Sequence, residues 1–172
     1  MKFFKTNLIL FAALIQLSCL AQTPNEKDLL QIAREVIASS GPVALITLDE
    51  NAQPRVRAMS PFEPEEDFSV WLATIPQSRK VDQIRSNPNV TLYYLSDSKS
   101  GYVTIRGTAE LIDDTASKEK YWKKGWEQFY PDYPDNYLLI KVTPTSLELI
   151  SEDHGIVGDK DTWTPPIITF DK

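Results

Sequence analysis

The sequence predicts a mainly β fold, an antiparallel barrel with helices packed on its outside. About six short runs of strand character are interspersed with three amphipathic stretches, and most connections have the length of hairpin turns. A doubly wound α/β sheet would need a helix between nearly every pair of strands, and the connection across Gln53 is too short for such a crossover. A chain of 172 residues with 42% hydrophobic and 24% charged content suits a single globular domain.

The first 21 residues are typical of a secretory signal peptide and are not expected to belong to the fold. Lys2 and Lys5 form a basic start, residues 7–17 are apolar, and small residues suited to cleavage surround Cys19. The apolar run is well short of the roughly 20 residues that a membrane-spanning helix needs. We therefore expect residues 22–172 to form a single exported domain, either periplasmic or secreted.

Cys19 is the only cysteine, and two interpretations of it stay open. It is either a site of lipid attachment, which Gln16 fits poorly, or merely part of the cleavage region. Cleavage after Ala21 would leave a mature domain without disulfides or a cysteine-based metal site. No twin arginine precedes the apolar run, which favours export of an unfolded chain that acquires any cofactor afterwards.

Two helices and four strands are expected in the first half of the domain. The segment 23–26 has the form of a capping box that opens a helix to about Ser39. Ser78 can cap a second helix, which Asn87-Pro88 ends. The strands are expected over residues 43–48, 54–60, 68–74 and 90–95.

The second half is expected to contain a long strand, an aromatic helix and a terminal hairpin. Residues 102–112 alternate as in a strand, with Gly107 as a bulge or bend. Asp113-Asp114 can cap a third helix. The hairpin is expected from residues 137–142 and 146–150, broken by Thr143-Pro144. The third helix is expected to present aromatic side chains to the core, to a dimer contact or to a planar ligand: Tyr121, Trp122, Trp126 and Phe129.

Charge excludes one class of function and limits another. The formal net charge of -6 argues against nucleic-acid binding, which requires a basic face. Any site for an anion must therefore be local.

His154, with acidic neighbours on a Gly-containing loop, lacks the ligand spacing of catalytic zinc sites, so we expect no metal centre.

A local anion site is indicated where two strands and a helix carry cationic and hydroxyl side chains. Arg57 lies on the second strand, Thr74 ends the third, and Ser78-Arg79-Lys80 opens the second helix. Guanidinium groups and helix N-termini both favour anions, so this set suits a phosphate. Simpler interpretations are that Arg55 and Arg57 are a solvated pair and that Ser78 only caps its helix.

The order of these motifs resembles the pyridoxamine-phosphate-oxidase-like FMN-binding split barrels, and within them the general stress protein 26 type. The shared elements are Gln-Pro-x-x-Arg at 53–57, a strand ending in Thr74, Ser-Arg-Lys at 78–80, Asn-Pro-x-Val at 87–90 and Gly-x-Ala-Glu at 107–110. The similarity covers about residues 27–150. It implies a six-stranded antiparallel split β-barrel and a homodimer with FMN at the subunit interface.

The resemblance also assigns residues to the flavin. It places the phosphate on Arg57 and on Ser78, Arg79 and Lys80, with Ala73 and Thr74 bordering the cofactor. It implies that Ala58, Met59 and Ser60 run beside the isoalloxazine ring, and that Tyr102 reaches the cofactor from the partner subunit. No catalytic side chain is expected, because the flavin itself would supply the redox chemistry.

Two departures from the family bear on the substrate. True pyridoxamine phosphate oxidases have a lysine where this chain has Phe62, and they end in an Arg-x-His motif that is absent from this C-terminus. We therefore expect no vitamin B6 oxidation and no cation for a substrate phosphate at that position. The leading hypothesis is a flavin-dependent oxidoreductase of unknown substrate. The alternatives are a non-catalytic module that holds flavin, haem or another planar ligand, and an empty barrel with only a structural role.

Overall fold

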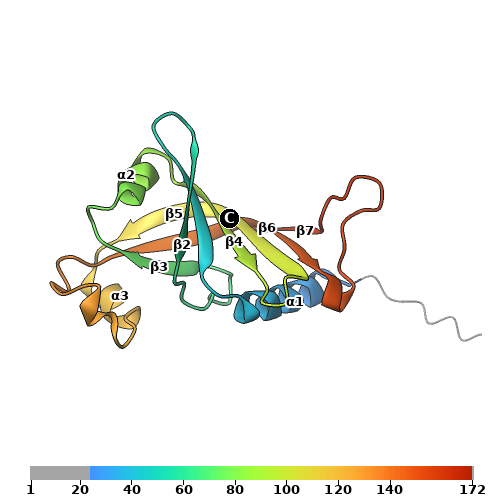
Figure 1. Cartoon of the computed structure of the whole chain (residues 1–172), viewed down its shortest axis with the longest axis horizontal. Helices are drawn as coiled ribbons and strands as arrows, with labels where there is room; N and C mark the ends of the chain where they lie inside the picture. The colour runs from blue at the N-terminus through green and yellow to red at the C-terminus, as the bar shows by residue number, and fades with distance from the viewer. Residues whose placement is uncertain (1–23, 172) are drawn as a thin grey trace, which may run out of the picture.

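Seven strands form one antiparallel sheet in the computed structural model, which describes residues 24–171 (Figure 1). Six of them follow the path β2-β1-β4-β5-β6-β3, and the short β7 pairs with β6 beside this path. The predicted mainly β fold is thus confirmed, although the short β7 was not among the predicted strands. The strands are β1 (Val43–Leu48), β2 (Pro54–Met59), β3 (Val70–Thr74), β4 (Asn89–Leu95), β5 (Gly101–Ile112), β6 (Leu138–Ser151) and β7 (Ile167–Thr169).

The sheet curls without closing, as in a split barrel. Its path ends at β2 and β3, and the chain leaving β2 touches β3 through a single bridge between Pro61 and Leu72. Beside that bridge, the Phe62 N–H donates to the Trp71 carbonyl oxygen at 2.9 Å. The described residues place a partner strand on only one side of β2, so its other edge keeps unpaired backbone groups.

Three helices accompany the sheet: α1 (Glu26–Ser39), α2 (Arg79–Ser86) and α3 (Thr115–Lys120). In Figure 1, α1 covers one end of the sheet, and α2 and α3 lie toward the other. The cap of α1 is Asn25 rather than Thr23, because the Asn25 and Asp28 side chains each accept the other's backbone N–H. Thr23, the predicted signal peptide and Cys19 all lie outside the described residues. Within residues 24–171 no helix combines the length and the apolar character that crossing a membrane demands.

Two groups of apolar side chains fill the structure. The larger is an aliphatic core between the sheet and α1, in which Leu45, Leu72 and Ile105 are fully buried. The second, called the aromatic cluster below, packs against the outer face of β3. It consists of Trp71, Ala73, Tyr121, Tyr137 and Leu139, with Phe62, Ile112, Trp122, Trp126, Tyr130 and Tyr133 against them.

The third predicted helix is wrong in its length. α3 ends at Lys120, and a 3₁₀ turn follows over Trp126–Gln128 after Gly125 adopts a left-handed φ of 89°. The aromatic side chains expected along one helix therefore lie on an irregular segment. This segment folds back, so that Tyr121 stacks on Trp71 with ring centroids 4.1 Å apart.

The predicted terminal hairpin is also wrong, because β6 runs through Pro144 as one 14-residue strand. Pro144 lies opposite Gly107, where the register between β5 and β6 shifts, so the predicted bulge at Gly107 is confirmed. A proline has no N–H to donate, and a bulge is where a strand tolerates that loss. A Cβ atom at Gly107 would lie 2.2 Å from the Thr143 carbonyl oxygen, so the close approach requires glycine.

Candidate anion-binding site

Arg57 is held from two sides by neutral groups. It points from β2 across β1 toward α2, where its guanidinium donates to Thr47 Oγ1 at 2.7 Å and to Gln83 Oε1 at 2.9 Å. Thr47 in turn donates to the same Gln83 oxygen at 2.6 Å. This triangle orients the guanidinium and leaves its positive charge uncompensated.

A second group forms where β3 ends and α2 begins. The Thr74 and Ser78 hydroxyl oxygens lie 2.9 Å apart, and Lys80 Nζ donates to Thr74 Oγ1 at 3.0 Å. Ser78 has the backbone conformation of an N-cap, but its side chain makes no capping hydrogen bond. The interpretation of Ser78 as only a cap is therefore not supported, and the first-turn N–H groups of α2 keep no side-chain acceptor.

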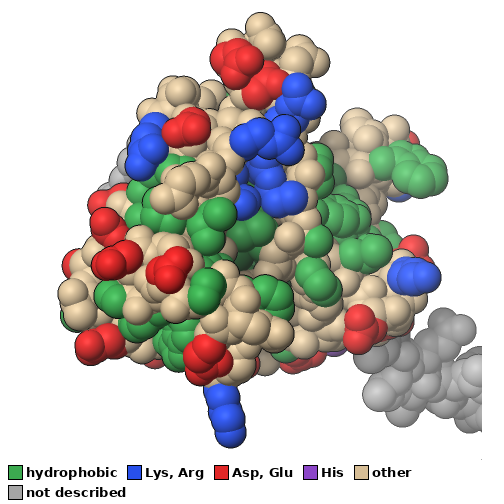
Figure 2. Space-filling model, turned by 60° about the vertical axis from the view of Figure 1, so that its left-hand side comes forward, with side chains coloured by type: hydrophobic (Ala, Val, Ile, Leu, Met, Phe, Trp, Pro, Cys, Tyr) green, Lys and Arg blue, Asp and Glu red, His purple; other side chains and the backbone are tan. Residues whose placement is uncertain are grey.

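These two groups belong to one concentration of positive charge. Burial, and then the nearby positive charge of Arg79, lower the pKa of Arg57. The pKa of Lys80 is also lowered, first by burial and then by Arg57 and Arg79. No carboxylate in residues 24–171 forms an ion pair with any of the three. Figure 2 shows Lys and Arg side chains gathered in one patch beside a hydrophobic hollow.

Arg55 is different, although it lies on the same strand two residues earlier. Its guanidinium pairs with Asp49 in the β1–β2 turn, at 2.7 Å and 2.8 Å. The predicted arginine pair is thus divided: the exposed Arg55 is neutralised by a carboxylate, and Arg57 is not. Only Arg57 has the environment of an anion-binding group.

The other residues expected at the flavin fall into two groups. Ala73 and Thr74 are buried side by side at the end of β3, and Ala58, Met59 and Ser60 continue from Arg57 along the open edge of β2. Tyr102 is apart from them within this chain. It lies on β5, where its ring stacks on Tyr93 with centroids 5.5 Å apart.

Two residues of the site were missed from the sequence: Thr47 and Gln83. A signal for Thr47 was available, because residues 43, 45 and 47 face the core in alternation and Thr47 is a polar side chain, 1% exposed, at such a position. Gln83 follows Arg79 by one helical turn, but nothing in the sequence says that its amide faces β1.

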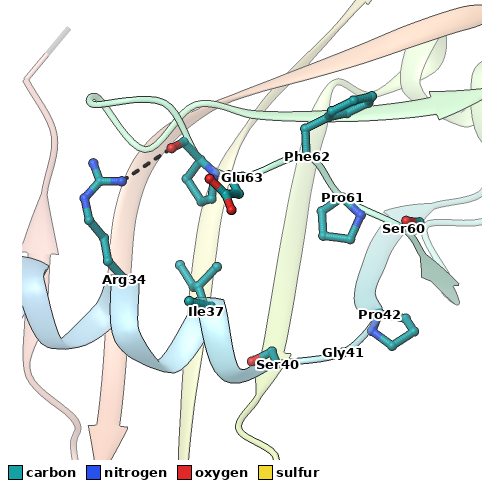
Figure 3. A pocket seen from close by; sticks show the side chains of 11 residues that line it. Arg34, Ile37, Ser40, Gly41, Pro42, Ser60, Pro61, Phe62 and Glu63 are labelled. Atoms are coloured by element: carbon teal, nitrogen blue, oxygen red, sulfur yellow. Dashed lines mark hydrogen bonds between the residues drawn. The ribbon is translucent and has the colours of Figure 1, made fainter. Parts of the chain in front are cut away.

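A pocket of about 550 Å³ lies between the end of α1 and the segment after β2. Figure 3 shows Ile37 and Pro42 on one side and Ser60, Pro61 and Glu63 on the other, with the Phe62 ring turned away from α1. Arg34 at its border donates to backbone carbonyl oxygens, among them that of Glu66 at 2.8 Å. This pocket is mostly apolar and does not include the cations of the anion site.

His154 does not take part in either feature. Its Nδ1 lies 2.8 Å from Ser151 Oγ and its Nε2 3.1 Å from Glu35 Oε2, so both ring nitrogens are engaged. In the described part of the chain, no three His, Cys, Asp or Glu side chains group so as to hold a metal ion.

Comparison with known proteins identifies the family. Residues 29–156 match the family model described as "Pyridoxamine 5'-phosphate oxidase like". The chain belongs to this family. A comparison with curated proteins finds no match.

Solved structures agree with the fold. General Stress Protein 26 from Bacillus anthracis str. Sterne is 27% identical, with a TM-score of 0.64 over 83% of this chain and 98% of that one. A pyridoxamine 5'-phosphate oxidase-related, FMN binding protein from Nostoc punctiforme PCC 73102 is 15% identical, with a TM-score of 0.60 over 88% and 99%. A heme binding protein from Mycobacterium smegmatis is also 15% identical, with a TM-score of 0.58 over 80% and 56%. The last two likenesses bear on the fold alone.

The residues present fit the phosphate of a flavin mononucleotide. Such a phosphate carries nearly two negative charges and needs two or three cations with additional donors. The pyridoxamine-phosphate-oxidase-like fold brings Arg57, Arg79 and Lys80 together with the hydroxyl groups of Thr74 and Ser78.

Proposed function

We propose that this chain binds FMN and acts as a flavin-dependent oxidoreductase, as a homodimer with the cofactor at the subunit interface. The observation that carries the proposal is the group Arg57, Arg79 and Lys80, which has no carboxylate partner among the described residues. Burial first, and then the neighbouring cations, lower the pKa of Arg57 and of Lys80. A chain of net charge -6 that keeps three cations together without neutralising them is organised for an anionic ligand.

Each part of the site has a role toward FMN. The cations and hydroxyl groups would hold the phosphate, and Thr47 and Gln83 would keep the guanidinium group of Arg57 oriented. The open edge of β2 at Ala58, Met59 and Ser60 offers backbone donors and acceptors to the polar edge of the ring, and Ala73 is small enough to let the ring approach β3. The bound flavin would supply the redox chemistry, which is why no catalytic side chain is assigned.

The substrate is not expected to be a vitamin B6 phosphate. Phe62 stands where a true oxidase has its lysine, and the C-terminal residues lack the Arg-x-His motif that holds that substrate. The domain is proposed to act after export, with Cys19 as a further membrane attachment if it carries lipid.

A non-catalytic module that holds haem is the second candidate, suggested by the fold of the mycobacterial heme binding protein. It is the weaker one, because a haem iron is usually held by an axial side chain such as histidine. The chain has one histidine, and both of its ring nitrogens already have partners in the structure.

The deciding experiment compares FMN with riboflavin, which lacks the phosphate. We expect purified protein to retain FMN with its absorption bands after desalting and to bind riboflavin much more weakly. The double variant R57A/K80A should lose about 100-fold or more in FMN affinity, because two charge-assisted contacts to the phosphate disappear. Its affinity for riboflavin should hardly change.

The matched control is R55A/R85A, which removes two arginines from the same strand and the same helix. Both arginines are exposed and paired with acidic side chains, Asp49 and Asp82. Circular dichroism would verify that both variants fold. Undiminished FMN binding by R57A/K80A contradicts the site, and a wild-type protein that ignores FMN contradicts the cofactor. Reduction of the bound flavin by NADH or NADPH would distinguish an oxidoreductase from a carrier.

A further inference from the structure

The ammonium group of Lys123 lies at the end of β2, on the face that carries the aromatic cluster. Its Nζ donates to Ser60 Oγ at 3.0 Å and to the Pro61 carbonyl oxygen at 2.5 Å. It also lies 4.6 Å from the centroid of the Phe62 ring and 5.2 Å from that of Trp126. An ammonium has three N–H donors, so one donor remains after the two hydrogen bonds.

The charge of Lys123 has no acidic partner in the described part of the chain. The neighbouring lysines of the same segment do have one, since Lys118 pairs with Asp113 at 2.6 Å and Lys120 with Glu65 at 3.1 Å. Lys123 is half-buried, and this burial lowers its pKa. Removing a cation from water without a counter-ion has a cost, and an incoming anion would relieve it.

Its location connects Lys123 to the proposed flavin site. Ser60, which it contacts, ends the segment expected to run beside the flavin ring. Phe62 and Trp126 belong to the same aromatic cluster as Ala73, which is expected to border the cofactor. Figure 3 shows the Phe62 ring turned away from α1, and the ammonium of Lys123 lies over this ring.

We propose that Lys123 is the specificity-determining residue for the substrate, and that the substrate is a small organic anion with a planar body. The remaining N–H of the ammonium would bind the carboxylate or phosphate group, and the rings of Phe62 and Trp126 would receive the planar part. This proposal rests on the proposed FMN site, because that site defines where a substrate must approach.

The position of Lys123 differs from an expectation drawn from the sequence. Phe62 indicated that no cation is available beside the end of β2, but the structure brings one there from a segment far along the chain. The ammonium of Lys123 covers the ring of Phe62 itself. The sequence spacing of Lys123 does not predict its contact with Phe62, because the irregular turn after α3 sets the position of Lys123.

The test measures anion binding to the FMN-loaded protein through the absorption spectrum of the flavin. Benzoate, phenyl phosphate and neutral benzamide are titrated into the wild type and into K123M, K123R and K124M. Lys124 is the matched control, since it is the adjacent lysine and is exposed. We expect an anion to perturb the flavin bands where benzamide does not. K123M should weaken this binding about tenfold or more, K124M should leave it unchanged, and K123R should restore it to within a few-fold.

The outcomes separate this proposal from the one before it. FMN affinity itself should be the same in all four proteins. The proposal is supported if either anion binds, if K123M weakens that binding and if K123R and K124M do not. The anion that binds more tightly identifies the charged group of the substrate. If FMN binds but no anion perturbs it, or if K123M and K124M behave alike, Lys123 does not select the substrate. A wild type that fails to bind FMN contradicts the proposed function instead.

Discussion

Individual cations in this protein differ by the partner that holds them. Carboxylates of the same chain form ion pairs with Arg55, Lys118 and Lys120 and neutralise their charges. Arg57 and Lys80 are held instead by neutral oxygens of Thr47, Gln83 and Thr74, which orient a cation without neutralising it. At this site the neutral partners therefore leave two oriented cations free to bind an anion.

Gln83 is therefore expected to affect FMN affinity, although it is not itself expected to contact the ligand. Q83L removes the oxygen that accepts from both Arg57 and Thr47 while keeping the side-chain size. The free guanidinium loses its fixed orientation, so FMN affinity should fall about tenfold, with riboflavin affinity unchanged. Equilibrium dialysis of both flavins checks it. The control Q31L, on an exposed face of α1, should bind FMN like the wild type, and equal binding by Q83L would refute the orienting role.

The sequence could indicate the residue types of the site but not their contacts. Arg57, Thr74, Ser78 and Lys80 were expected together because they form motifs at strand and helix ends, and the structure does bring them together. Gln83 and Lys123 could not be found in this way. Their roles depend on where a helix face and an irregular turn are placed by packing, and neither leaves a pattern in the chain.

Among the elements, the loop before β3 is tied to the segment after α3 by one carboxylate. Glu65 accepts from the Tyr121 hydroxyl at 2.5 Å and from Lys120 Nζ at 3.1 Å. These hydrogen bonds lower the pKa of Glu65 from an ordinary 4.5 to about 2, and the one from Tyr121 has the largest effect. The folded state therefore prefers the ionised carboxylate, and the contact contributes stability that depends on pH.

The contribution should be complete above about pH 4.5 and should disappear as the pH falls toward 2, because a lowered folded-state pKa stabilises only the ionised form. E65Q should therefore unfold at lower urea concentration than the wild type at pH 7, and the difference should shrink steadily between pH 4.5 and 2. Urea unfolding at a series of pH values measures it. The exposed neighbour variant E66Q should show no such trend, and a pH-independent effect of E65Q would contradict the assignment.

Elements with strong local signals were predicted to within a few residues, and the failures have physical causes. α1, β1 and β4 combine clear periodicity with capping or turn residues. β6 was divided in two because Pro144 normally ends a strand, whereas here the bulge at Gly107 accommodates it. β7 is only three residues long and exists through its pairing with β6, which no local pattern reveals.

At the scale of the whole molecule, an acidic chain carries a positive site made from three separate elements. β2, β3 and α2 meet because the sheet curls until its two ends come together at the Pro61–Leu72 bridge. This approach of the two sheet ends brings the cations of β2 and α2 close together. Attraction for an anion then acts only locally, since charges beyond roughly 10 Å are screened at ordinary ionic strength.

Tyr102 shows how a second copy of the chain would complete this site. Within one chain it stacks on Tyr93, away from the cations, although the family resemblance assigns it to the cofactor. If the proposed homodimer exists, each flavin would rest on the cations of one subunit and on Tyr102 of the other. Light scattering should then give twice the mass of the chain, and Y102A should weaken FMN binding without affecting the cation group of its own subunit.

A mixed dimer makes the shared site testable in one experiment. R57A/K80A subunits and Y102A subunits, each tagged differently and each poor in FMN binding as a homodimer, are coexpressed and the mixed dimers purified. In a two-fold symmetric dimer, one of the two sites collects all the substitutions and the other has none. The mixed dimer should therefore bind one FMN with nearly wild-type affinity, measured by flavin absorbance per dimer. If Tyr102 served its own subunit instead, both sites would be defective and the mixed dimer would bind no better than its parents.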